Sequence, residues 1–266
     1  MSTVLLEKIT NDERIALLTV NRPEVLNALN DAVMAELEAA VDKLERDETV
    51  KALIITGAGE RSFVAGADIA EFAARSPAEH YSVCMSAHAL LSRIETMDKI
   101  TVAAVGGWAL GGGCELAMCC DVRVASANAL FGLPEVSLGT IPGYGGTQRL
   151  ARLIGMGRAK ELIFTTDRVD ARRALELGLV NRVVEERPAL LDTCVELVQH
   201  MLKNSFDSII AAKHAVFEGA QCDLRTGLAH EAALAAGTFS SPDLKEGVSA
   251  FLGKRKPDFA SSKPAK

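Results

Sequence analysis

Two glutamates that stand beside glycine-rich turns could carry out acid–base chemistry in this chain. Glu115 comes two residues after a run of three glycines, and Glu135 lies between Pro134 and Val136, ahead of a glycine cluster at 143–146. Apolar neighbours raise the proton affinity of a carboxylate, so that such a group can give or take a proton near neutral pH. A single buried glutamate is more often paired for structural reasons, but two acids beside two glycine turns together favour a catalytic role.

The ten residues at 106–115 hold five glycines and have the pattern of a ligand-binding turn. An apolar stretch at 100–105 precedes the glycines and an apolar run at 116–120 follows, which predicts a buried strand, a turn and a buried helix. The first N–H groups of a helix have no partner within it, and glycine lets a ligand approach them closely. Such amides suit a developing negative charge, so the segment predicts an oxyanion hole; glycines that serve close packing alone are the alternative.

A second turn of small residues, at 63–69, follows a strand that we expect at 52–56. Its free amides could supply a second donor to the same oxyanion. A plain strand-to-helix turn with Asp68 as its cap explains this segment equally well when it is taken alone.

Several other kinds of site are not supported by the sequence. No Gly-Lys-Ser/Thr follows the glycines, and their spacing is not that of a dinucleotide-binding turn. The sequence has no Gly-x-Ser-x-Gly elbow, so a serine hydrolase is not supported. The histidines lie on helical patterns without metal-ligand spacing, and the six cysteines form no CxxC pair. We therefore expect no metal site, and reduced core thiols rather than disulfides.

Composition and charge indicate a soluble globular protein. Of 266 residues, 48% are hydrophobic and 24% charged, and the net charge of −6 argues against nucleic acid as a partner. The sequence has no uninterrupted apolar stretch of about 18 residues, so we expect no membrane span. The first residues lack the basic and apolar regions of a signal peptide, so we expect a cytoplasmic protein.

Hydrophobic patterns place short strands among helices, in an order that is not strictly βαβ. We expect a hairpin over 4–20, further strands at 52–56, 100–105, 122–125 and 129–131, a helix after Asn30 and another over 78–97. Beyond residue 147 helices dominate, at 147–155, 157–164, 171–177, 188–203, 205–218 and 224–238. This predicts a mixed ββα arrangement, with a break near Ser205 before an all-helical tail.

Taken together, these segments resemble the enoyl-CoA hydratase/isomerase (crotonase) family. The similarity covers nearly the whole chain and rests on several independent motifs in the right order. They are NRPEVLNAL at 21–29, FVAGADI at 63–69, ALGGGCELA at 109–117, FGLPE at 131–135, GTIPG at 139–143, GGTQRL at 145–150 and FLGKRKP at 251–257.

The resemblance implies an α/β fold: a crotonase-like spiral of ββα units with a C-terminal helical trimerisation region. We therefore expect a catalytic core over 1–204 and a trimerisation region over 205–266, assembled as a homohexamer of two stacked trimers. The implied substrates are acyl thioesters of coenzyme A, as in fatty acid β-oxidation. No metal or redox cofactor is implied, because coenzyme A is part of the substrate.

The resemblance also assigns roles to the two turns and the two acids. By motif position, the N–H groups of Ala67 and Gly112 form the oxyanion hole for the thioester carbonyl. Glu115 and Glu135 match the pair of glutamates with which hydratases hold one water. The amide of Gly143 matches a group that helps to position that water.

Two further segments are implied to line the coenzyme A moiety. One is the loop that contains Glu24, Val25 and Asn27. The other contains Ala65, Asp68 and Ile69. Trp108 and Tyr144, next to the glycine turns, are either core residues or pocket-lining residues that shape the acyl pocket.

Retention of both acids favours a hydratase within the family. We assign Glu115 as the base and Glu135 as the acid for addition of water to a 2-enoyl-CoA. An isomerase on the same scaffold is the first alternative, and a non-catalytic acyl-CoA- or RNA-binding protein is an alternative of another class. Leu133 stands where many hydratases carry glutamine, and Gly106 where asparagine is common.

Overall fold

The larger of two β-sheets forms the centre of the protein. The computed structural model describes residues 2–69, 71 and 74–263. The strand order is β1–β2–β3–β5–β7–β10; β1 pairs with β2 in antiparallel fashion, and the four following pairs are parallel. The strands are β1 (Val4–Ile9), β2 (Asp12–Val20), β3 (Ala52–Gly57), β5 (Ile100–Val105), β7 (Val122–Ser126) and β10 (Arg182–Val184).

A second, smaller sheet is built from very short strands in the order β4–β6–β8–β9. They are β4 (Ser62–Val64), β6 (Trp108–Leu110), β8 (Leu130–Gly132) and β9 (Val169–Asp170). The chain alternates between the sheets, because β4 follows β3, β6 follows β5 and β8 follows β7. The expected ββα arrangement is therefore confirmed.

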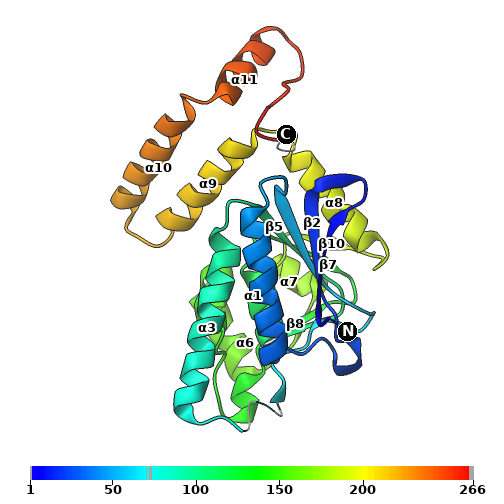
Figure 1. Cartoon of the computed structure of the whole chain (residues 1–266). Helices are drawn as coiled ribbons and strands as arrows, with labels where there is room; N and C mark the ends of the chain where they lie inside the picture. Colours follow the sequence, from blue (N-terminus) through cyan, green and yellow to red (C-terminus); the bar gives the residue numbers. More distant parts are fainter. Residues whose placement is uncertain (1, 70, 72–73, 264–266) are drawn as a thin grey trace.

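The helices cover the sheets and extend beyond them (Figure 1). Their bounds are α1 (Asp31–Arg46), α3 (Pro77–Thr96), α4 (Gly112–Met118), α5 (Gly146–Ile154), α6 (Met156–Thr165), α7 (Ala171–Leu177), α8 (Ala189–Met201), α9 (Phe206–Gly219), α10 (Leu224–Thr238) and α11 (Pro242–Leu252). Two 3₁₀ turns are η1 (Pro23–Val25) and η2 (Glu135–Leu138). The expected cap of α1 is confirmed, since the Asn30 side chain accepts from the Val33 N–H at 2.9 Å.

The sequence patterns missed α11 and the strands β4, β6, β9 and β10. These strands have two or three residues, too few for an alternating pattern. The start of α11 carried a usable signal: the Ser241 side chain accepts from the Leu244 N–H at 3.1 Å, and Pro242 is the first helical residue.

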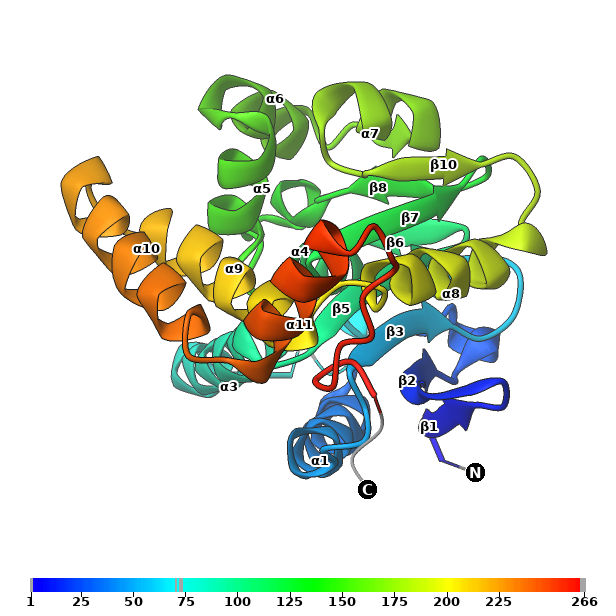
Figure 2. The ribbon, with the colours of Figure 1, turned by 90° about the horizontal axis from the view of Figure 1, so that it is seen from above.

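Alternate residues of the larger sheet face two separate hydrophobic cores. In β3, Leu53 belongs to the main core between the sheets and helices, whereas Ile54 belongs to a second core beneath α8. Figure 2 shows α8 lying across these strands. With both faces buried, the strands read as continuous apolar runs, and their carboxyl ends are fixed as a platform for the glycine turns.

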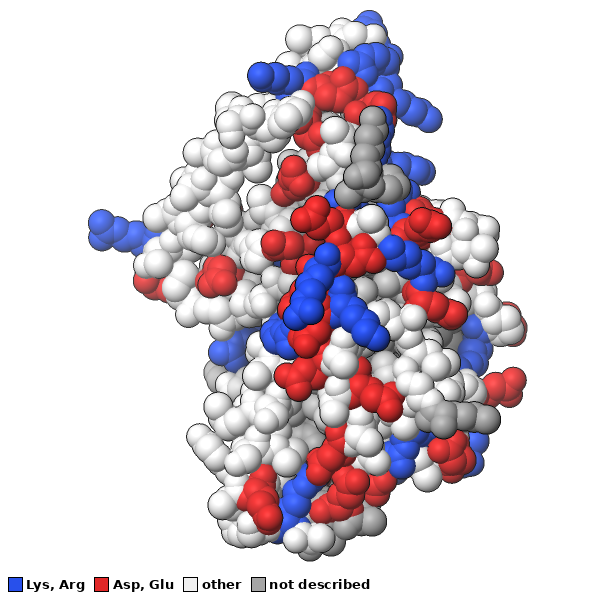
Figure 3. Space-filling model, viewed as in Figure 1, with Lys and Arg blue, Asp and Glu red and all other residues white. Residues whose placement is uncertain are grey.

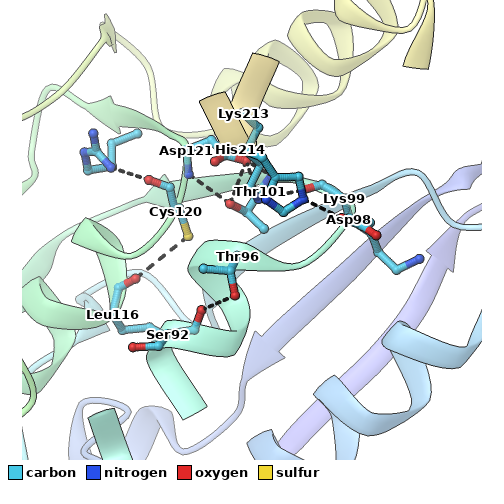
Figure 4. Close-up of polar contacts among 11 residues, drawn as sticks. Ser92, Thr96, Asp98, Lys99, Thr101, Leu116, Cys120, Asp121, Lys213 and His214 are labelled. Carbon is cyan, nitrogen blue, oxygen red and sulfur yellow. Dashed lines mark hydrogen bonds and ion pairs between the residues drawn. The ribbon is translucent and has the colours of Figure 1, made fainter. Parts of the chain in front are cut away.

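The helices α9, α10 and α11 project from the sheets as an arm (Figure 1). At its base, Lys213 Nζ donates to the Lys99 carbonyl at 2.8 Å and lies 3.1 Å from Asp121 Oδ2, and His214 Nε2 lies 2.7 Å from Asp98 Oδ1 (Figure 4). No residue of α10 is buried, and its surface is largely uncharged on the face that Figure 3 shows. The division of the chain into a catalytic core over 1–204 and a trimerisation region over 205–266 stays a prediction.

No helix in the described ranges combines the length and apolar character needed to cross a membrane. The six cysteines are all free thiols.

Candidate active site

Gly111 joins β6 to the amino end of α4. The sequence pattern predicts a strand, a glycine turn and a helix in this order, but it misses β6, which lies within the predicted turn. Gly111 caps the helix with a φ of 50°, in the left-handed region that favours glycine. Gly112 is the first helical residue, so its N–H has no acceptor within the helix. Glu115 follows in the first turn, and every residue of α4 is buried.

The second predicted donor, Ala67, lies on an extended segment beside Leu29. The two residues form a parallel bridge, in which the Leu29 N–H donates to the Gly66 carbonyl and the Asp68 N–H to the Leu29 carbonyl, each at 2.8 Å. In such a bridge the N–H of the residue between the two bonds points away from its neighbour. The Ala67 amide therefore faces away from Leu29.

One pocket brings together both amides and both acids. Its lining comes from the turn after β4, the start of α4, α3, η2 and the glycine cluster that precedes α5. The lining residues are Ala65, Gly66, Ala67, Ile69, His80, Gly111, Gly112, Glu115, Pro134, Glu135, Leu138, Thr140, Ile141, Gly143 and Tyr144. Ala67, Gly112, Gly143, Glu115 and Glu135, predicted from separate motifs, thus share one cavity.

Glu115 is held by the backbone of a distant turn. Its Oε1 accepts the N–H groups of Tyr144 at 2.8 Å and Gly146 at 2.6 Å, and the residue is 1% exposed. Burial raises the pKa of Glu115 to about 7, an effect that the Glu135 charge reinforces and the two amides oppose. Glu115 is therefore suited to exchange a proton near neutral pH.

Glu135 has a different environment in the same pocket. It begins η2, and burial raises the pKa of its carboxyl group. Its Oε2 is buried and has no hydrogen-bond partner in the part of the chain that the structure describes. A buried carboxyl oxygen without a donor favours the protonated form, which can donate to a bound molecule.

The glycine at position 113 is required by close packing rather than by chemistry. A Cβ there would lie 1.9 Å from the Val64 carbonyl oxygen of β4. We expect Gly113→Ala to lower the free energy of unfolding by about 1–3 kcal/mol and to displace the Gly112 amide.

Urea unfolding measures this effect, with Gly157→Ala in α6 as its control, since a Cβ at Gly157 meets nothing within 4 Å. Equal stability of the two variants would contradict the packing argument.

Of the residues expected around coenzyme A, some line the pocket, some are exposed on a neighbouring loop and one is buried. Ala65 and Ile69 line the pocket, and Glu24 and Val25 are exposed on η1. Asn27 is fully buried: its side-chain amide donates to the Ala58 and Ser62 carbonyls at 2.9 and 3.1 Å. Its side chain thus fixes the shape of the loop instead of facing a ligand.

Asp68 does not line the pocket. Its Oδ2 lies 3.5 Å from Arg22 Nη2, so it forms an ion pair with the loop that precedes η1. This pair ties together the two segments expected around coenzyme A.

The structure separates Trp108 from Tyr144 and adds His80 to the pocket. Tyr144 lines the pocket, but Trp108 does not; its ring lies 5.9 and 5.7 Å from the guanidinium carbons of Arg61 and Arg168. Trp108 opens β6, at the end away from Gly111 and Gly112. His80 lines the pocket from α3, and a lone histidine on a helical pattern gave no signal of that position.

Two positions that depart from the family pattern have structural explanations. Leu133 is 1% exposed in the main core. A Cβ at Gly106 would lie 2.4 Å from Arg187 Nη1, which donates to the Glu60 carbonyl at 3.0 Å. The arginine occupies the space that a side chain at position 106 would need.

Three exposed apolar side chains border the pocket. They are Ile69, Leu138 and Ile141, which are 60%, 58% and 65% exposed. Exposed apolar groups beside a concave site with a few polar atoms are typical of a pocket for a partly apolar ligand. Among the described residues, no cluster of three histidine, cysteine or acidic side chains could hold a metal ion.

The fold and the site together define a crotonase-like protein. The crystal structure of an enoyl-CoA hydratase from Bacillus anthracis superimposes with a TM-score of 0.92 at 36% identity, covering 97% of this chain and 99% of that one.

The sequence is similar to other proteins over the same extent. It is 46% identical to a short-chain-enoyl-CoA hydratase from Clostridium acetobutylicum over 96% of this chain and 97% of that protein. It is 45% identical to a crotonyl-CoA hydratase from Syntrophomonas wolfei subsp. wolfei over 97% and 98%. The sequence model of the enoyl-CoA hydratase/isomerase family matches residues 10–262. The chain belongs to this family.

Proposed function

We propose that the protein is an enoyl-CoA hydratase that adds water reversibly across the 2,3 double bond of 2-enoyl-CoA thioesters. The observation that carries this proposal is the pair of acids, Glu115 and Glu135, in one pocket with the Ala67 and Gly112 amides. An isomerase needs one group to move a proton, whereas hydration needs one group to take a proton from water and another to supply one to carbon.

In this mechanism the thioester oxygen accepts hydrogen bonds from the N–H groups of Ala67 and Gly112. Attack of water at C3 builds negative charge on that oxygen, and each amide donor aimed at it contributes roughly 10²–10³ in rate. Glu115 takes a proton from the water while the hydroxyl bonds to C3, and Glu135 gives a proton to C2. The amide of Gly143 helps to position the water.

The environments of the two acids support this assignment of roles. Two N–H donors stabilise ionised Glu115, whereas Glu135 Oε2 has none in the described part of the chain. Burial raises the pKa of Glu115 to about 7 while its two N–H donors favour ionisation, so the proposed mechanism uses the state in which Glu115 is ionised and Glu135 keeps its proton. That is the state in which Glu115 can act as the base.

Crotonyl-CoA, a four-carbon 2-enoyl thioester, tests the proposed activity. Hydration removes the conjugated double bond, so its ultraviolet absorbance falls, and the product is the 3-hydroxyacyl-CoA. A series of longer enoyl-CoA esters would define the preferred chain length. A protein that hydrates none of these esters, or only moves the double bond, would not be a hydratase.

The rate is expected to depend on pH in a direction set by Glu115. Because the base must be ionised, kcat/KM should rise as the pH increases through about 7, the pKa of Glu115. Steady-state rates between pH 5 and pH 9 measure this titration. A rate that does not rise through this interval would contradict the role of Glu115 as the base.

The coenzyme A moiety is expected to lie along the loop of Glu24, Val25 and Asn27 and the segment of Ala65, Asp68 and Ile69. The Arg22–Asp68 ion pair, which joins these segments, supports a single binding surface. The exposed apolar border of the pocket suits the acyl chain. No metal or redox cofactor takes part in this proposal.

We also propose that the protein is a cytoplasmic homohexamer, a dimer of trimers, with residues 205–266 as the trimerisation region. Large apolar side chains on the arm support association, since they are mostly exposed in a single chain: Val216, Leu224, Phe239, Phe251 and Leu252. Six free thiols suit a reducing compartment.

A further inference from the structure

Glu115 depends on a turn that a second charged pair holds in place. The turn runs from Tyr144 to Gly146, and both of its ends donate an N–H to Glu115 Oε1. Any shift of this turn would move the carboxylate or remove its donors.

Arg149 also holds this turn, through a hydrogen bond to its backbone. From α5, its Nη1 donates to the Tyr144 carbonyl at 3.1 Å, while Nε and Nη2 donate to Glu95 Oε2 of α3 at 3.0 and 2.7 Å. The two side chains are 12% and 23% exposed, so solvent screens the pair only weakly. Tyr144 thus receives a hydrogen bond at its carbonyl and donates one from its N–H.

The sequence of the turn makes room for this contact. Gly145 has a φ of +105°, and a Cβ there would lie 2.3 Å from Arg149 Nη1. Glycine therefore serves two purposes here: it permits the left-handed backbone, and it lets the guanidinium approach.

We infer that Glu95 and Arg149 are positioning residues for Glu115: they hold the turn whose amides bind its carboxylate, and they set the electric field at that carboxylate. This inference rests on the proposed hydratase function. Neither residue lines the pocket, so neither is placed in contact with the substrate.

Charges and titratable groups surround Glu115 on several elements. Glu135 faces it from η2, Cys84 and His80 lie on α3, Tyr144 lies in the turn, and Cys114 precedes it in α4. Arg149 is a cation that acts on Glu115, and it lowers the pKa of that group against the effects of burial and Glu135. A second cation, Arg75, acts on the neighbouring Tyr144 and Cys84. Loss of the Arg149 charge should therefore make Glu115 harder to ionise.

The test is the pH dependence of crotonyl-CoA hydration in the full-length protein. We expect Arg149→Met to lower kcat about tenfold or more, because small displacements of a catalytic group are costly, with KM changed less. We also expect the titration near neutrality to move up by about half a pH unit or more. Arg149→Lys should restore the titration but only part of kcat, because lysine keeps the charge and loses the fork of donors.

Glu95→Gln keeps an acceptor for Arg149 and removes the negative charge. The titration of Glu95→Gln should move to lower pH, in the direction opposite to that of Arg149→Met. Because this change is conservative, it still tests the inference if Arg149→Met does not fold. Arg152→Met is the matched control: Arg152 is exposed one turn along on α5 and donates to Gln148.

Wild-type protein that fails to hydrate the ester would contradict the proposed function itself. If the wild type is active, a pH profile of Glu95→Gln and Arg149→Met that matches Arg152→Met would overturn the positioning role alone. A fall in kcat without a shifted titration would mean that the Glu95–Arg149 pair only maintains the structure of the turn. It would overturn the inference that the pair sets the electric field at Glu115.

Discussion

Replacing Glu135 by glutamine is expected to lower kcat for hydration of crotonyl-CoA by about 10²–10⁴-fold, the usual contribution of a positioned acid. Glutamine fills the same space, but its amide cannot give up a proton to C2. Binding of the ester should survive, because the Ala67 and Gly112 amides and the apolar border are unchanged. Steady-state kinetics and a direct binding measurement with the product 3-hydroxyacyl-CoA separate these two effects.

Glu185→Gln is a suitable control for this variant, since Glu185 is exposed, pairs with Arg172 and does not line the pocket. The control should retain wild-type kcat and KM. Unchanged turnover in Glu135→Gln would remove Glu135 from the mechanism, and lost binding of the ester would show that its role is to bind rather than to donate.

Replacing Glu115 by glutamine is expected to have opposite effects on activity and stability. Turnover should fall by about 10²–10⁴-fold, because an amide cannot take a proton from water. The side-chain carbonyl of glutamine can still accept the N–H groups of Tyr144 and Gly146, so the turn should keep its shape.

The effect on stability follows from the raised pKa of Glu115. Its pKa is about 7 in the folded protein against 4.5 as the ordinary value, so the folded state binds this proton more tightly than the unfolded chain. Raising the pH through this interval therefore destabilises the folded wild type, by on the order of 3 kcal/mol when complete. Glu115→Gln has no such titration.

Urea unfolding of the wild type and Glu115→Gln at pH 5 and pH 8 measures this difference at one protein concentration. The variant should gain stability relative to the wild type as the pH rises. A difference that stays constant between the two pH values would mean that the burial of Glu115 does not alter its proton affinity.

The sequence predicts the long elements well and the short ones poorly. Apolar periodicity is strong in α1, and continuous apolar runs mark the buried strands β3 and β5. The strands of the second sheet have two or three residues and owe their geometry to neighbours such as β4 and β6, which lie far apart in the chain. No local pattern encodes such pairing.

The same distinction holds for the pocket. Glu115, Glu135 and the glycine turns could be found because acids and glycines are unusual in apolar surroundings. His80 and the Glu95–Arg149 pair could not, because their helical patterns resemble those of any solvated face. Their significance comes from contacts between distant segments, such as the Arg149–Glu95 pair between α5 and α3, which only the folded chain defines.

The separation of the pocket's components along the chain has a consequence for folding. Ala67 follows β4, Gly112 begins α4, Glu135 begins η2 and the donors to Glu115 precede α5. No single segment of the chain therefore contains both acids and both oxyanion donors. Contacts between such distant segments form late, because they require closure of long loops. Recovery of activity during refolding would therefore report completion of the whole core, whereas helix content would report only its early steps.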